Sequence, residues 1–161
     1  MISSQVIELS KIEIKRYTKD RISDVLQFGR DLRAEENLCG WEIDEKYIAN
    51  VTASFEDPAF ANSLSLLAYM DGKVVGRIDS AKICSRFDGS VKAYLDWICV
   101  IKSYRHKGVA QMLLKELRRQ LKKSGVETLI ALTDSSEASQ RFYRKVPNSE
   151  MKDTGIWIDI I

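Results

Sequence analysis

A short basic segment with one glycine, RHKGVA, occupies positions 105–110 of the sequence. It follows the apolar run YLDWICVI (94–101) and precedes the amphipathic pattern MLLKELRRQLKK (112–123). Where a loop enters a helix, the first N–H groups are unpaired and carry partial positive charge, and both features attract phosphate. Gly108 would let a diphosphate approach the backbone closely, and the neighbouring cations would add charge. The segment therefore predicts a phosphate-binding loop, with a plain basic turn or a nucleic-acid patch as alternatives.

The elements around this loop follow from hydrophobic periodicity. Strand patterns lie at residues 11–17, 64–70, 73–84, 94–101, 126–132 and 155–161, and helical patterns at about 22–32, 44–55, 108–123 and 135–146. Asp71-Gly72 is a strong two-residue hairpin signal. We predict an α/β (α+β) fold with a mixed, mostly antiparallel sheet and helices on both faces. The unit over residues 94–132 is expected to form a right-handed parallel crossover.

Composition narrows the class of protein. The chain has 161 residues, 45% hydrophobic and 30% charged, which fits one soluble domain over residues 1–161. A net charge of +2 is too near neutral to favour nucleic acid or a membrane surface. Three scattered cysteines and one histidine predict neither a disulfide framework nor a metal site. The N-terminus shows no secretion signal, and we expect a cytoplasmic protein.

The loop and its context resemble the acyl-CoA-binding signature of the GNAT superfamily of N-acyltransferases, [Q/R]-x-x-G-x-[G/A]. In this chain the signature reads Arg105, His106, Lys107, Gly108, Val109 and Ala110. The preceding ICV (98–100) fits the strand that leads into the loop. The segment FYRK (142–145) lies on the following helix pattern, which comes after one more strand. The order of elements matches the family from Lys11 onward, which implies the fold already predicted.

The resemblance implies that acetyl-CoA is the co-substrate, with no metal, and that the chain transfers its acetyl group to a primary amine. The implied cofactor-binding residues are Ile98, Cys99, Val100, Arg105, His106, Lys107, Gly108, Val109, Ala110, Ser136, Ser139 and Tyr143. The backbone of residues 98–100 would hold the pantetheine arm, and the N–H group of Val100 would polarise the thioester carbonyl.

The same resemblance assigns two catalytic groups. Tyr143 is the expected general acid, because a phenol with a pKa near 10 stays protonated at neutral pH and can protonate the departing thiolate. Asp96 is the expected general base. Strict alternation would place it on one strand face with Ile98 and Val100. A tyrosine packed on the sheet and an aspartate with a structural hydrogen bond remain the alternatives.

Two departures from the family pattern concern the second half of the chain. Ser136 stands where relatives often carry asparagine, and Ser139 where alanine is common. Pro147-Asn148 stands where glycine-phenylalanine is usual, so we expect a differently shaped final hairpin. A Cys99–His106 nucleophile is not expected, since Cys99 should point away from Asp96 as a small core residue.

The acceptor is less well defined. Acidic residues surround Trp41 and either attract a cationic amine or form a solvated loop: Glu35, Glu36, Glu42, Asp44 and Glu45. We expect a small-molecule or peptide amine, no membrane and no nucleic acid, and a homodimer is an open alternative to a monomer. A non-catalytic acyl-CoA-binding regulatory module is the second hypothesis. Nucleic-acid binding is the third, through a basic face that is more simply a solvated one: Lys115, Arg118, Arg119, Lys122 and Lys123.

Overall fold

The structure is a computed structural model that describes residues 11–36, 42–153 and 155–160. The chain divides into two compact units, Met1–Ile130 and Ala131–Ile161, and each is described by itself. The first unit holds nearly all of the sheet and the glycine loop, and the second holds the helix that carries Tyr143. That residues 1–161 form one domain stays a prediction.

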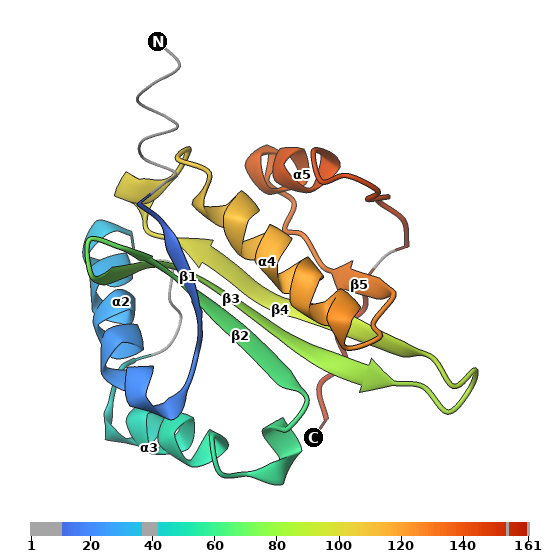
Figure 1. Cartoon of the computed structure of the whole chain (residues 1–161), viewed down its shortest axis with the longest axis horizontal. Helices are drawn as coiled ribbons and strands as arrows, with labels where there is room; N and C mark the ends of the chain where they lie inside the picture. The colour runs from blue at the N-terminus through green and yellow to red at the C-terminus, as the bar shows by residue number, and fades with distance from the viewer. Residues whose placement is uncertain (1–10, 37–41, 154, 161) are drawn as a thin grey trace. The chain divides into compact units, whose positions relative to one another are not determined.

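The sheet has five strands in the order β1-β2-β3-β4-β5 (Figure 1). Their bounds are β1 Glu13–Arg16, β2 Ser63–Met70, β3 Lys73–Cys84, β4 Val91–Val100 and β5 Thr128–Ala131. The pairs β1–β2, β2–β3 and β3–β4 are antiparallel. Asp71 and Gly72 both have positive φ, 51° and 78°, which is the backbone that a two-residue hairpin requires. The predicted α/β fold class and its early antiparallel strands are confirmed.

Each of the four predicted helices is present. They are α2 Ile22–Glu35, α3 Glu45–Ser54, α4 Val109–Lys123 and α5 Glu137–Arg144. A side-chain oxygen of Asp44 accepts a hydrogen bond of 2.7 Å from the amide of Tyr47, which caps α3. The neighbouring strands β4 and β5 are joined through α4, as the sequence predicted.

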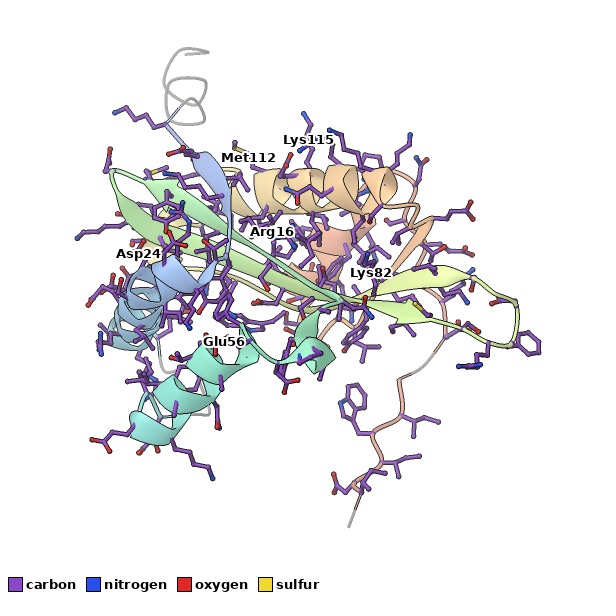
Figure 2. The ribbon with its side chains drawn as sticks, turned by 60° about the horizontal axis from the view of Figure 1, so that its bottom comes forward. Arg16, Asp24, Glu56, Lys82, Met112 and Lys115 are labelled. Atoms are coloured by element: carbon purple, nitrogen blue, oxygen red, sulfur yellow. The ribbon has the colours of Figure 1, made fainter. Side chains whose placement is uncertain are left out.

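Two layers of helix cover the sheet of the first unit. Phe28 and Leu32 of α2 belong to a buried cluster with Tyr17, Leu67 and Tyr69, and side chains of α3 pack against it. On the other face α4 lies along the strands (Figure 1) and buries its apolar stripe: Val109, Leu113, Leu114, Leu117 and Leu121. Figure 2 shows Met112 and Lys115 on the side of α4 turned away from the strands. The helices therefore lie on both faces, as predicted.

The final predicted strand is wrong for the residues that the structure describes. Residues 155–160 have no strand hydrogen-bond pattern, and position 161 lies outside the described residues. The apolar side chains of this segment are exposed, Ile156 by 83% and Trp157 by 76%. Alternation shows that a segment can form a strand, but a strand exists only where a neighbouring strand takes up its hydrogen bonds.

Candidate active site

The glycine loop runs from the end of β4 to the first turn of α4. A short 3-10 turn, η3 (Lys102–Tyr104), follows β4 and leads into the loop. His106 and Gly108 both have left-handed backbone, with φ of 62° and 82°. Left-handed geometry is ordinary for glycine but uncommon for other residues, and it recurs at functional sites. Gly108 therefore has the role that the sequence predicts, and His106 adds a second such position that the sequence did not indicate.

The N-terminus of α4 lacks a side-chain cap. Asp44 caps α3 and Ser136 caps α5, whereas the residue before α4 is Gly108, which has no side chain to accept a hydrogen bond. The first turn of α4 also contains no acidic residue. Among the described residues, therefore, no side chain caps the leading N–H groups of this 15-residue helix, and these groups suit an anion. The donors present fit a diphosphate.

The guanidinium group of Arg105 is already engaged within the protein. Its Nε donates to the carbonyl oxygen of Val100 at 3.0 Å. Its two terminal nitrogens donate to the two carboxylate oxygens of Glu36 at 3.0 and 2.6 Å. The sequence predicts that Arg105 supplies charge for phosphate, which stays a prediction, but the structure gives that charge a carboxylate partner.

A second contact joins the same two segments. The amide and the hydroxyl of Ser103 donate to the two carboxylate oxygens of Glu35, at 2.8 and 2.7 Å. These hydrogen bonds lower the pKa of the Glu35 carboxyl, with the hydroxyl as the larger cause. Two consecutive glutamates at the end of α2 thus bind two residues of the segment between β4 and α4.

The remaining loop side chains contribute in different ways. Val109 is the first residue of α4, and its side chain is buried, so only its backbone can face a ligand. His106 is exposed, and the ammonium group of Lys107 lies 5.6 Å from the centre of the Tyr104 ring. The loop therefore offers a cofactor mainly backbone N–H groups and the charge of Lys107.

Strand β4 contains a bulge at Asp96. Trp97 pairs with Asp79 and Leu95 pairs with Ser80, so Asp96 is an extra residue without a partner on β3. The bulge interrupts the alternation on which the prediction of a face shared by Asp96, Ile98 and Val100 rested, so the shared face stays a prediction. Asp96 is exposed. Bulges are common beside active sites because they redirect one side chain.

The peptide that follows Val100 has a defined direction. The amide of Ile101 donates to the carbonyl oxygen of Val75 on β3 at 3.0 Å. Across a planar trans peptide the carbonyl of Val100 points the opposite way, away from β3. In extended backbone the N–H of Val100 points to that same side. The N–H of Val100 is therefore not directed at β3, and its contact with a thioester carbonyl stays a prediction.

Tyr143, Ser136 and Ser139 lie in the second unit, which is described by itself. The hydroxyl of Ser136 accepts a hydrogen bond of 3.2 Å from the amide of Ser139 and caps α5. Asp134 accepts from the amide of Ser136 at 2.6 Å and from the hydroxyl of Ser139 at 2.9 Å. Hydrogen bonds lower the pKa of the Asp134 carboxyl: the largest cause is the side chain of Ser136, followed by the amide of Ser136 and the hydroxyl of Ser139. The two serines thus shape the start of the helix that carries Tyr143, which is partly buried against Phe142.

Sequence reasoning missed the buried polar group beside the bulge. Arg77 and Asp79 of β3 form an ion pair of 2.7 Å, and their side chains are 17% and 14% exposed. The hydroxyl of Ser65 donates to Asp79 at 2.6 Å, and the guanidinium lies 4.9 Å from the ring centre of Tyr17. Asp79 is the residue that pairs with Trp97, so this group borders the bulge. An R-x-D spacing within a strand was the available signal.

The acidic residues near α2 and α3 divide into two sets. Glu35, Glu36 and Asp44 bind protein groups, as described above, so they are more than a solvated loop. Glu42 and Glu45 are exposed, and Trp41 lies outside the described residues. Of the five acidic residues that the sequence offers for a cationic acceptor, only Glu42 and Glu45 are therefore left.

Several other predictions concern side chains without a catalytic role. Cys99 packs against the core cluster under α2, as expected of a small core residue. On the basic face of α4, Arg119 binds Glu116 at 2.6 Å, an ordinary pair on an outer helix surface.

The described residues contain no cluster of ligands able to hold a metal ion. Among the described helices, none is both long enough and apolar enough to cross a lipid bilayer.

Fold and loop together define the class of protein. A sheet strand that runs through a left-handed glycine into an uncapped helix is an arrangement by which α/β proteins hold a phosphate-bearing ligand. The family model described as Acetyltransferase (GNAT) family matches residues 12–146 of this sequence. The chain belongs to this acetyltransferase family, as its resemblance indicated.

Solved structures share the fold at low sequence identity. The aminoglycoside acetyltransferase meta-AAC0020, from an uncultured soil metagenomic sample and in complex with sisomicin, has a TM-score of 0.79 at 16% identity, over 94% of this chain and 98% of that chain. AAC(6′)-Iy in complex with the bisubstrate analogue CoA-S-monomethyl-acetylneamine has a TM-score of 0.73 at 19% identity, over 93% and 99%. A ribosomal-protein-alanine N-acetyltransferase from Brucella melitensis biovar Abortus 2308 reaches 0.70 at 14%, over 93% and 99%. No curated protein sequence matches the chain significantly.

Proposed function

We propose that this chain transfers the acetyl group of acetyl-CoA to a primary amine of a small molecule or a peptide. The observation that carries the proposal is the uncapped N-terminus of α4 behind the left-handed pair His106 and Gly108. Its N–H groups suit the diphosphate of a CoA ester, and the chain's membership of the family agrees with acetyl transfer.

The chemistry is direct transfer. The nitrogen of the amine attacks the thioester carbonyl carbon, an N–C bond forms, the C–S bond breaks, and the amine loses a proton. Developing negative charge on the carbonyl oxygen is stabilised by the N–H of Val100, which points away from β3. Tyr143 donates its phenolic proton to the leaving sulfur, and Asp96 accepts the amine proton, directly or through water. The exposed position of Asp96 on the bulge is open to an amine that arrives from solvent.

The acceptor class rests on the comparisons and on charge. One of the similar structures is an aminoglycoside acetyltransferase in complex with sisomicin, a second holds a bisubstrate analogue of CoA and acetylneamine, and a third is a ribosomal-protein-alanine N-acetyltransferase. Both kinds of acceptor present an amine that is cationic until it loses a proton. Glu42, which precedes α3, and Glu45, its first residue, are exposed and would attract such a group.

The direct test is acetyl-CoA turnover against a panel of aminoglycosides, polyamines and peptides. Free thiol is followed spectroscopically, and the acetylated product is identified by mass. We expect thiol release that depends on one class of amine. Binding of CoA without turnover for any amine would instead support the non-catalytic regulatory module, and absence of both would refute the proposal.

Two variants separate the catalytic roles from binding. Tyr143→Phe and Asp96→Asn should each lower kcat by about 10²-fold or more while the Kd for CoA changes little, because each removes a proton-transfer group and not a contact with phosphate. Lys115→Gln is a matched control that changes an exposed residue on the outer side of α4 (Figure 2). An unchanged kcat in Tyr143→Phe would remove this residue from the mechanism.

A further inference from the structure

The side chain of Arg105 joins its loop to the end of β4, five positions earlier, and to the segment after α2, 69 positions earlier. Its Nε donates to the carbonyl oxygen of Val100, the last residue of β4. Its two terminal nitrogens form a fork of two hydrogen bonds with the carboxylate of Glu36, just beyond α2. Val100 is also the residue whose N–H is expected to face the thioester. The guanidinium N–H groups that make these contacts therefore point to groups of the protein itself.

The form of the Arg105–Glu36 pair favours a permanent contact. Two parallel N–H···O bonds use the planar shapes of both groups, which makes the pair strong and directional. The side chains are 34% and 19% exposed, so water screens the pair less than a pair on the open surface. If Arg105 turned to a phosphate, it would leave a largely buried carboxylate without its partner.

The neighbouring contact between Glu35 and Ser103 holds the same segments together. Consecutive glutamates therefore bind two residues that precede Gly108 by five and three positions. Both contacts join the end of α2 to the segment before the left-handed turn. Held at two points, the turn keeps its N–H groups in one arrangement before a ligand arrives.

We propose that Arg105 is a positioning residue, which holds the acetyl-CoA-binding loop through Glu36 and Val100 and does not itself bind the phosphates. The proposal rests on the function proposed above and adds how this chain's loop is organised. It assigns to Glu36, which has no place in the loop motif, an indirect part in cofactor affinity.

The two possible roles of Arg105 predict opposite effects of Glu36→Gln. If Arg105 positions the loop, loss of the carboxylate loosens the loop, and the affinity for CoA falls by about tenfold. If Arg105 binds phosphate, the same change frees its charge, and the affinity stays equal or rises. Arg105→Gln weakens binding in either case and does not discriminate alone.

Isothermal titration with coenzyme A itself measures these affinities without any acceptor. We expect Glu36→Gln and Arg105→Gln each to weaken binding and the double variant to be no weaker than Arg105→Gln, because all three lose the same fork and Arg105→Gln already loses the bond to Val100 as well. The salt dependence of binding should be the same in Arg105→Gln as in the original protein, because no phosphate contact is lost. Glu116→Gln, which removes an Arg–carboxylate pair of the same kind within α4, should leave the Kd for CoA unchanged.

A second substitution covers the case in which Glu36→Gln does not fold. Arg105→Lys keeps the charge but loses the fork, so it should weaken CoA binding nearly as much as Arg105→Gln. Affinity retained in Arg105→Lys, or unchanged or tighter binding in a folded Glu36→Gln, overturns the positioning role and leaves the proposed function standing. No binding of CoA by the original protein overturns both.

Discussion

Gly76 of β3 lies directly beneath Val109, the first residue of α4. A Cβ atom at Gly76 would lie 2.8 Å from Cγ1 of Val109 and 3.1 Å from Cδ1 of Leu113. Gly76 also pairs with Val100 across the sheet. The missing side chain therefore fixes how closely the start of α4, and with it the glycine loop, approaches the end of β4.

Gly76→Ala should destabilise the fold by about 1–3 kcal/mol, because the added methyl group overlaps a buried side chain that has little room to move. Thermal and denaturant unfolding measure the change. In the double variant Gly76→Ala/Val109→Ala the overlap is removed, so the two substitutions should be strongly non-additive. Additive effects would show that Val109 is not the group that excludes a side chain at position 76.

His106→Val should weaken CoA binding, since a β-branched residue disfavours the left-handed backbone that His106 adopts at φ 62°. Strain of this kind costs about 1–3 kcal/mol. His106→Gly keeps access to the same backbone and should bind CoA as the original protein does. Calorimetry on the pair separates backbone from side chain: equal losses in both variants would mean that the imidazole itself contacts the cofactor.

Tyr17 makes stability depend on pH in the alkaline range. Its hydroxyl is buried and has no hydrogen-bond partner among the described residues. Burial raises the pKa of Tyr17 to about 12, an effect that the nearby Arg77 partly opposes. The unfolded chain loses the phenolic proton near pH 10 and the folded chain only near 12, so stability from this group is complete below pH 10 and falls as pH rises through that interval.

Tyr17→Phe should reduce this alkaline loss and, by removing a buried unpaired hydroxyl, stabilise the protein at neutral pH by about 1 kcal/mol. The measurement is the free energy of unfolding of both proteins across pH 7–11, compared as a difference so that other titrating groups cancel. A lower stability of the phenylalanine variant at neutral pH would indicate that the hydroxyl has a partner.

Two substitutions at Ser136 should distinguish a structural role of its hydroxyl from a role in binding the cofactor. Ser136→Ala removes the cap of α5 and should cost about 1 kcal/mol, whereas Ser136→Asp retains a good capping group and should keep stability. If the hydroxyl also binds the pantetheine arm, Ser136→Asp should weaken acetyl-CoA binding despite its stable fold. Unchanged affinity in Ser136→Asp would limit Ser136 to the cap.

Local sequence patterns were sufficient to predict the four helices, the hairpin at Asp71-Gly72 and the family. These depend on local properties: hydrophobic period, the conformational freedom of glycine, and the spacing of a loop motif. Gly108 was found for this reason, because its left-handed backbone serves a turn that lies within a few residues of it.

Tertiary structure alone decided the contacts that organise the candidate site. Arg105 and Glu36 are 69 positions apart, and no local spacing indicates that they meet. The bulge at Asp96 depends on the register with β3, and the expected strand at residues 155–161 depends on a neighbour that the described segment does not have. A local pattern indicates which element a segment can form. It does not indicate which other segment will pack against that element, because pairing energies arise only between groups that folding brings into contact.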